Sequence, residues 1–202
     1  MGSMKTEHMK EYQQKLRRRL LSMTVQAPPQ PWHGVTFVHV GGPEAIGFGA
    51  DSDLLLLVSV SGRSVVDCAS GEKIARDQDD SYSWFDTTSL TAEGIGPLES
   101  QHIRISGVYG GGMPTMTSDG WRLEVVAPDW PYSFVLLHAP GYLTEEGWKE
   151  GVATKVAPRL CDQFPDEVLA FGFSPTGKSF AVMMRDGVEI FHRAEGGTWQ
   201  RT

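Results

Sequence analysis

The stretch FGFSPTGKSFAVMMRDGVEIFHR, residues 171–193, contains two strand-like segments joined by a tight-turn pair. The first, SFAVMM (179–184), is almost entirely apolar, and in the second, VEIFHR, apolar and polar residues largely alternate. The pair Asp186-Gly187 separates them, and an Asp-Gly pair in this position is a strong indication of a β-hairpin. The turn residues SPTG (174–177) separate the hairpin from a further apolar segment. The stretch therefore predicts three consecutive short antiparallel strands.

The same pattern occurs twice more upstream. Tight-turn pairs stand at Ser61-Gly62, Asp119-Gly120 and Asp186-Gly187, and the strands RSVVDCA, WRLEVVA and VEIFHRA follow them. These strands end at second turns that begin at Ala69, Ala127 and Ala194. The glycines are 120 - 62 = 58 and 187 - 120 = 67 residues apart, and the alanines are separated by the same 58 and 67. Because two landmarks keep the same offsets, we predict an internal repeat of three units.

Each unit also has strand-like segments around its hairpin. They are AIGFG, LLLLVSV and EKIAR in the first unit, LAFGF and SFAVMM in the last, and IRISGVY, MPTMTS and YSFVLL in the middle unit. The segments before the middle hairpin are weaker, because glycines interrupt them. We therefore expect up to four short antiparallel strands in each unit, and the 23 glycines and 12 prolines agree with many turns.

Residues 169–193 resemble a blade of the WD-repeat and related β-propellers, with FSPTGK at the turn between inner strands and RDGVEIF at the next hairpin. Residues 46–77 resemble such a blade more loosely. The Gly-His and Trp-Asp signatures of the family are absent, and the spacing is longer than its usual 40–45 residues. The resemblance implies an all-β, propeller-like body of about three repeated four-stranded units. A β-sandwich built from the same hairpins is the alternative.

The ends of the chain complete this expectation. Little chain follows Trp199 to form an outer strand for the last unit, so we expect GVTFVHV (34–40) to pair there and cover the open edge. Extra length lies at 78–101, which can contain more strands, and at 139–167, where Thr144 is a candidate cap for a short helix.

The N-terminal residues predict a helix at 5–23. Met9, Tyr12, Leu16, Leu20 and Met23 recur at steps of three and four, which makes one apolar face. The proline-rich QAPPQP (26–31) ends it. We therefore divide the chain into a helix and linker, 1–31, and a single β-domain, 32–202.

Charge and composition restrict the function classes. The net charge is -7, and residues 1–23 contribute 6 - 2 = +4, so the remainder carries -7 - 4 = -11. This acidic body disfavours nucleic-acid binding, although the basic Arg17–Arg19 leaves an RNA adaptor as a weaker hypothesis. The longest apolar run, 54–58, is too short to cross a membrane, and no signal peptide is visible. A cytoplasmic protein of unknown oligomeric state is expected.

No motif indicates a reaction, and we expect no catalytic residue, cofactor or metal. The two cysteines have no metal-binding spacing, and Cys68 is expected to be a buried apolar residue. The glycine run GVYGGGMP (107–114) lacks phosphate-loop spacing and predicts a tight turn. The alternative is an enzyme, in one form metal-dependent, with its site at the mouth of the β-body. Its candidate ligands are the carboxylates Asp77, Asp79, Asp80 and Asp86 and the strand histidines His39, His138 and His192.

Large aromatic residues in the predicted connections indicate a binding surface. They are Trp84, Phe85, Trp130, Tyr132, Tyr142 and Trp148. Aromatic side chains on the loops of a rigid scaffold are typical of protein-binding sites, although the same residues can cap sheet ends and be buried. We therefore expect a non-enzymatic protein-binding module, one form of which is an immunity-type protein that neutralises a bacterial toxin.

Overall fold

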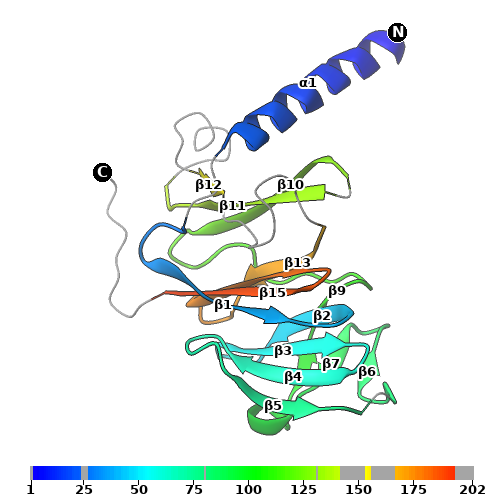
Figure 1. The fold of residues 1–202 in the computed structure, drawn as a ribbon, viewed down its shortest axis with the longest axis vertical. Helices are drawn as coiled ribbons and strands as arrows, with labels where there is room; N and C mark the ends of the chain where they lie inside the picture. Colours follow the sequence, from blue (N-terminus) through cyan, green and yellow to red (C-terminus); the bar gives the residue numbers. More distant parts are fainter. Residues whose placement is uncertain are drawn as a thin grey trace.

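The computed structural model describes residues 2–23, 27–79, 81–130, 132–141, 153–155 and 167–193. It shows one long helix and four antiparallel sheets, so the predicted all-β fold with an N-terminal helix is confirmed (Figure 1). The helix, α1 (Gly2–Ser22), precedes all strands, and the short 3-10 helix η1 (Gly96–Leu98) follows the seventh strand.

Two sheets contain the predicted first and last units. The terminal sheet has the order β1 (Trp32–His39), β15 (Gly187–Arg193), β14 (Ser179–Met184) and β13 (Val168–Phe173). The five-stranded sheet has the order β5 (Lys73–Asp77), β4 (Gly62–Asp67), β3 (Leu54–Ser59), β2 (Pro43–Phe48) and β9 (Ser106–Gly107).

Two sheets of three strands complete the body. The helix-side sheet has the order β10 (Arg122–Asp129), β11 (Tyr132–His138) and β12 (Ala153–Lys155). The small sheet has the order β6 (Phe85–Asp86), β7 (Thr91–Glu93) and β8 (His102–Arg104). The small sheet confirms that 78–101 contains additional strands.

The first and last units have matching strands. β2, β3 and β4 begin at residues 43, 54 and 62, and β13, β14 and β15 begin at 168, 179 and 187, each 58 + 67 = 125 residues later. Both hairpins close at equivalent pairs, Ser59 with Gly62 and Met184 with Gly187. The strand content predicted for these two units is therefore confirmed.

The middle unit departs from the prediction. Its predicted first strand is divided between β8 and β9, which belong to different sheets, and MPTMTS contributes only an isolated bridge from Met116 to Arg122. Pro114 and the preceding glycines explain the interruption, because proline removes a ladder donor and glycine weakens a strand. The strand β10 also continues past the expected turn at Ala127 as far as Asp129, with an irregular register after Val126.

The two ends of the β-body pair with each other. β1 runs antiparallel to β15, from Trp32 opposite Arg193 to His39 opposite Gly187, with a bulge between Gly34 and Thr36. This pairing covers the outer edge of β15, as expected for the segment 34–40. A closed propeller and the relationship to WD repeats remain predictions.

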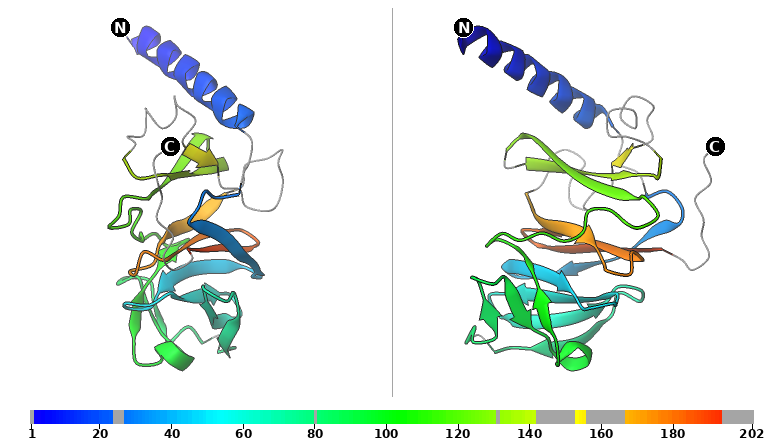
Figure 2. Two further views of the ribbon diagram at one scale, coloured as in Figure 1. Left: turned by 90° about the vertical axis from the view of Figure 1, so that its left-hand side faces the viewer. Right: turned by 180° about the vertical axis from the view of Figure 1, so that it is seen from behind.

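The sheets stack face to face in the order helix-side, terminal, five-stranded and small (Figures 1 and 2). Leu55 and Leu57 pack toward the terminal sheet, whereas Leu56 and Val58 on the same strand pack toward the small sheet. This explains the uninterrupted apolar run of β3, because a strand buried on both faces needs apolar residues at every position.

Among the described residues, the helix packs on the body through its C-terminal end. Leu20 is buried against Phe134 and Leu136 of the helix-side sheet, and Leu16 lies beside it, whereas Tyr12 is exposed. Figures 1 and 2 show the rest of α1 extending away from the sheets. Among the described residues, no helix is long and apolar enough to cross a membrane.

Candidate functional site

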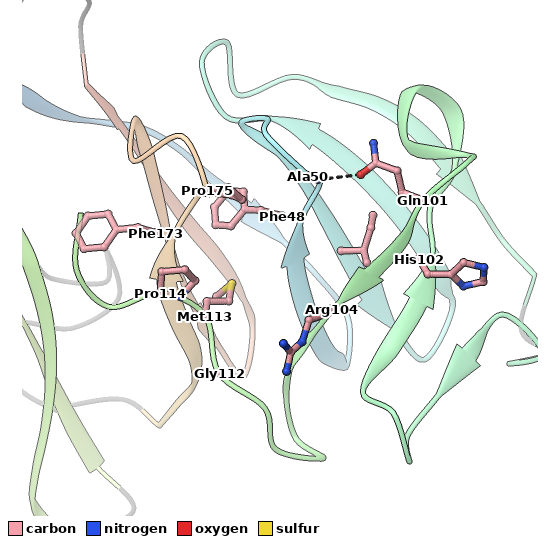
Figure 3. A pocket seen from close by; sticks show the side chains of 11 residues that line it. Phe48, Ala50, Gln101, His102, Arg104, Gly112, Met113, Pro114, Phe173 and Pro175 are labelled. Atoms are coloured by element: carbon pink, nitrogen blue, oxygen red, sulfur yellow. Dashed lines mark hydrogen bonds between the residues drawn. The ribbon is translucent and has the colours of Figure 1, made fainter. Parts of the chain in front are cut away.

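A cavity of about 750 Å³ lies between the inner strands of the terminal and five-stranded sheets (Figure 3). Its described lining is mainly apolar, with three longer polar side chains. The lining residues are Phe48, Ala50, Gln101, His102, Ile103, Arg104, Gly112, Met113, Pro114, Phe173 and Pro175. Cavities of this size that combine apolar walls with a few polar groups are typical of ligand sites.

The repeat builds two walls of the cavity from equivalent positions. Phe48 ends β2 and Phe173 ends β13, and 173 - 48 = 125 is the offset between the two units. Ala50 and Pro175, which also line the cavity, have the same offset. The two units therefore present the same strand ends to one space.

A glycine precedes each of these phenylalanines and allows another segment to approach. A Cβ on Gly47 would lie 2.3 Å from the Arg104 carbonyl oxygen, and one on Gly172 would lie 2.4 Å from the Met113 Cβ. The loop at Met113 is also held by the Phe173 N–H, which donates to the Pro114 carbonyl oxygen at 2.7 Å. The Gly-Phe pair thus lets β8 and the 112–114 loop form the remaining walls.

The polar groups of the cavity differ in what they contact. The side-chain oxygen Oε1 of Gln101 accepts a hydrogen bond from the Ala50 N–H at 2.8 Å, which holds the β8 end against the turn after β2. Arg104 is exposed, and among the described residues its guanidinium forms no hydrogen bond or ion pair. In Figure 3 the Arg104 guanidinium and the His102 ring extend to opposite sides. Arg104 is therefore available to an anionic group of a ligand.

The described lining combines apolar surface with the Arg104 guanidinium and one imidazole, that of His102. None of the described lining residues carries a carboxylate, hydroxyl or thiol. The lining consequently lacks the nucleophile and base pair on which covalent catalysis depends. It can hold an apolar group against Phe48 and Met113 and an anion beside Arg104, whereas the Phe173 ring is buried in the core with Trp32 and Phe180.

A half-buried polar cluster beside the cavity joins the two sheets. Asp53, in the turn after β2, accepts hydrogen bonds from the Ser174 hydroxyl at 2.7 Å and from the Thr176 hydroxyl at 2.8 Å. Ser174 Oγ in turn accepts the Ser179 N–H at 3.1 Å. We call Asp53, Ser174 and Thr176 the inter-sheet clamp, because its hydrogen bonds connect the five-stranded sheet to the terminal sheet.

A serine–histidine pair lies next to this clamp. The Ser179 hydroxyl and His192 Nδ1 are 2.9 Å apart, but Ser179 is 0% exposed and the clamp carboxylate bonds other groups. A fully buried hydroxyl cannot reach a substrate, so this pair has a structural role. Cys68 is also fully buried, and burial raises the pKa of its thiol, with a further increase from the Asp53 and Asp67 carboxylates. The expectation that Cys68 is a buried residue is confirmed.

His192 should make stability depend on pH. Its burial lowers the pKa of its imidazole below the ordinary 6.5, although the Asp53 and Asp67 carboxylates oppose this shift. The unfolded chain then binds the proton more readily, so the free energy of unfolding should fall as pH decreases through 6.5. Urea unfolding at pH 7.5 and at pH 5.5 measures this fall, because these two pH values lie above and below the ordinary histidine pKa of about 6.5.

The variant His192→Gln removes the titrating group and keeps a side chain that can bond the Ser179 hydroxyl. It should reduce the loss of stability between the two pH values. An equal loss in the variant and the unchanged protein would assign the pH dependence to other groups. The hydrogen bond from the Ser81 backbone N–H lowers the pKa of the Asp79 carboxyl. Asp79 therefore titrates below the pH range of this experiment.

The candidate metal ligands of the alternative hypothesis are not brought together among the described residues. No group of three or more His, Cys, Asp or Glu side chains that could hold a metal occurs in the described part of the chain. His39 contacts Phe37, His138 pairs with Glu124 and His192 with Ser179, on β1, β11 and β15. The loop carboxylates of Asp79 and Asp86 accept hydrogen bonds from Ser81 and from Thr88 and Ser89. Asp80 lies outside the described residues.

Two of the predicted partner-binding aromatics have clear and opposite positions. Trp84 is 4% exposed, its indole N–H donates to the Asp79 carbonyl oxygen at 3.0 Å, and the Arg63 guanidinium lies 4.6 Å from its ring centre. This burial corrects the expectation that Trp84 contacts a partner, because its surface is covered by its own chain. Trp130 is 82% exposed beside the β10–β11 connection and fits the expectation.

Of the other four aromatics, the structure describes the side chain of Phe85 alone. Phe85 is half-buried, with ring centres 6.0 Å from Trp84 and 5.6 Å from Tyr109. Tyr132 is a residue of β11, and Tyr142 and Trp148 lie outside the described residues.

The glycine run 107–114 leads from β9 to the cavity, and the sequence pattern predicted only a tight turn there. The predicted tight turn is present, since Gly107 and Gly110 exchange backbone hydrogen bonds of 2.9 Å. Its Val108 and Tyr109 are exposed, and Gly112 and Met113 line the cavity. The glycine run therefore connects the exposed Val108 and Tyr109 to residues that line the cavity, a role that only the positions of its neighbours reveal.

Comparison with known proteins identifies no relative: no protein-family model matches the chain, and no curated protein sequence matches it.

Proposed function

We propose that this chain is a non-enzymatic protein-binding module whose cavity receives a segment of its partner. The observation that carries the proposal is the 750 Å³ cavity, with its apolar lining and with Arg104, whose guanidinium has no partner among the described residues. Apolar anchors inserted into a pocket and a desolvated arginine are the contacts that dominate protein interfaces. The fitting segment carries a bulky apolar side chain near a carboxylate.

Exposed apolar residues beside the cavity support a macromolecular ligand. Val108 and Tyr109 are exposed on the loop that continues to Met113, and Tyr109 contacts Phe85. We define the binding face as Phe85, Arg104, Val108, Tyr109 and Met113. An aromatic and apolar rim around a pocket extends the contact area beyond one inserted side chain.

The charge of the body suggests the character of the partner as a whole. The residues outside 1–23 carry a net charge of -7 - 4 = -11. This charge favours a partner with a basic surface around the inserted segment. An immunity-type role, in which the chain holds and neutralises a toxin, is one form of this proposal.

Removing the arginine charge should weaken partner binding. A tagged chain is used to isolate its partner from the source organism, and the purified pair is then measured by calorimetry. Arg104→Gln should raise the dissociation constant about 10- to 100-fold, because it removes a charge-assisted contact from the binding face. Met113→Asp should have an effect at least as large, since it places a carboxylate on the apolar wall.

Two control variants make this test specific. Arg18→Gln removes the same charge on the exposed side of α1 and should leave the affinity unchanged. Trp130→Ala tests the other candidate surface, the exposed tryptophan beside the β10–β11 connection. Loss of binding in Trp130→Ala together with full binding by Arg104→Gln would place the interface there and overturn the cavity assignment.

A further inference from the structure

A second hollow, of about 80 Å³, lies on the five-stranded sheet near the end of β1. His39 ends β1, Ser61 stands in the β3–β4 turn, and Lys73 and Arg76 belong to β5; all four line the hollow. The proposed partner cavity shares none of these residues. This hollow is therefore a separate feature, and we call it the basic hollow.

The charges around the basic hollow differ from those of the body. Its described lining contains Arg63, Lys73, Arg76 and His39 but a single carboxylate, Asp77. The body outside residues 1–23 carries -7 - 4 = -11, so a concentration of basic groups here runs against the overall charge. Such local excess of positive charge attracts anions.

The one carboxylate is already neutralised. Asp77 Oδ2 accepts hydrogen bonds from Arg63 Nε at 3.2 Å and Arg63 Nη2 at 3.1 Å. Arg63 also donates to the Glu93 carbonyl oxygen and lies over the Trp84 ring, so its position is set by three different contacts. Asp77 is therefore compensated by Arg63 and does not balance other cations.

Two cations remain without a balancing group. Lys73 and Arg76 are exposed, and among the described residues neither side chain forms a hydrogen bond or an ion pair. Ser61 and Ser64 add hydroxyl donors to the lining, and the neutral His39 ring carries one N–H. A planar guanidinium, an ammonium and hydroxyls around one small space are the donors that bind tetrahedral oxyanions in proteins.

We propose that the basic hollow binds a compact oxyanion of the phosphate class, with Arg76 and Lys73 as its main ligands. A volume of about 80 Å³ corresponds to about two to three water molecules. The hollow can therefore admit one phosphoryl group but not a nucleoside. The open side of the hollow lets that group belong either to free phosphate or to a larger phosphorylated molecule.

Titration calorimetry of the full chain with sodium phosphate tests this site, against sodium chloride at equal ionic strength. Two charge-assisted contacts predict saturable binding with a dissociation constant on the order of 1 mM. Arg76→Gln should weaken binding about 10-fold, and Lys73→Gln should do so to a similar degree. Both side chains are exposed, so these variants are expected to fold.

Lys10→Gln provides the charge-matched control, since Lys10 is exposed on α1. It should bind phosphate as the unchanged protein does. Absence of saturable binding would overturn the proposal, as would an equal loss in Lys10→Gln, because the effect would then be general charge screening. A parallel titration with O-phosphoserine separates the sources: equal affinity supports free phosphate, and tighter binding supports a phosphoryl group on a larger ligand.

Discussion

Replacing Trp32 with alanine should lower the free energy of unfolding by about 3–5 kcal/mol, the usual cost of truncating a fully buried aromatic residue. Trp32 is 1% exposed, and its ring centre lies 5.0 Å from Phe180, 5.5 Å from Phe173 and 5.9 Å from Trp121. These rings join the terminal sheet to the helix-side sheet. Urea unfolding followed by circular dichroism measures the loss.

The position of Trp32 in the chain adds to this effect. It is the first residue of β1 and pairs with Arg193, the last residue of β15, so its ring anchors the strand that covers the sheet edge. Loss of the ring should therefore also weaken the β1–β15 pairing. Hydrogen exchange of the β15 amides should be faster in the variant if this pairing opens.

Two further variants show whether packing is the cause. Trp32→Phe should cost less than Trp32→Ala, because it keeps an aromatic ring and removes a buried indole N–H that has no hydrogen-bond partner among the described residues. Trp130→Ala should change stability by no more than about 0.5 kcal/mol, since Trp130 is 82% exposed. A loss below about 1 kcal/mol in Trp32→Ala would contradict the structural role of this ring.

The second large effect is expected at the inter-sheet clamp. Asp53→Ala should lower the free energy of unfolding by about 2–4 kcal/mol, because hydrogen bonds to a charged acceptor contribute about 1.5–3 kcal/mol each and their effects overlap here. The variant removes the acceptor of the Ser174 and Thr176 hydroxyls, and Ser174 is buried. Urea unfolding at neutral pH measures the change.

A neighbouring aspartate supplies the control for the clamp. Asp53→Asn and Asp51→Asn make the same change of charge two residues apart, but Asp51 is exposed and is not a member of the clamp. Asp51 has a φ of 49°, a conformation that asparagine tolerates well. Asp51→Asn should therefore be nearly neutral, and equal losses in the two variants would show that net charge, not the clamp, is responsible.

The clamp also connects stability to the proposed function. Asp53 lies close in sequence to Ala50, and Ser174 and Thr176 flank Pro175; both Ala50 and Pro175 line the cavity. Hydrogen bonds between these turns hold two walls of the cavity at a constant separation. A clamp variant that still folds should therefore bind its partner less tightly than the unchanged protein.

Local pattern was sufficient where neighbouring residues decide the structure. The hairpins at Gly62 and Gly187 form where they were predicted, because turn geometry depends on the conformations available to a few adjacent residues. Each glycine lies in the closing pair, so the loops themselves are residues 60–61 and 185–186. The same reasoning was incomplete for Asp119-Gly120. Its turn forms, but the segment before it contributes only a bridge at Met116.

The candidate site could be predicted only in part. The phenylalanines Phe48 and Phe173 share the repeat offset, so their equivalence was visible in the sequence. That they line one cavity with Arg104 and Met113 was not visible, because these residues come from a unit that departs from the repeat. Trp84 and Trp130 show the same limit, since both lie in predicted connections and only one is exposed.

By itself, the sequence determined the hairpins, the helix, the matching strands of the first and last units and the pairing of the two ends of the β-body. These features follow from turn residues, from apolar periodicity and from the need to cover a sheet edge. Only the tertiary structure decided which aromatic rings are exposed, how the inter-sheet clamp forms, and where the cavity and the basic hollow lie. Each of these depends on how four sheets stack, and stacking brings together residues whose separation in the chain carries no local signal.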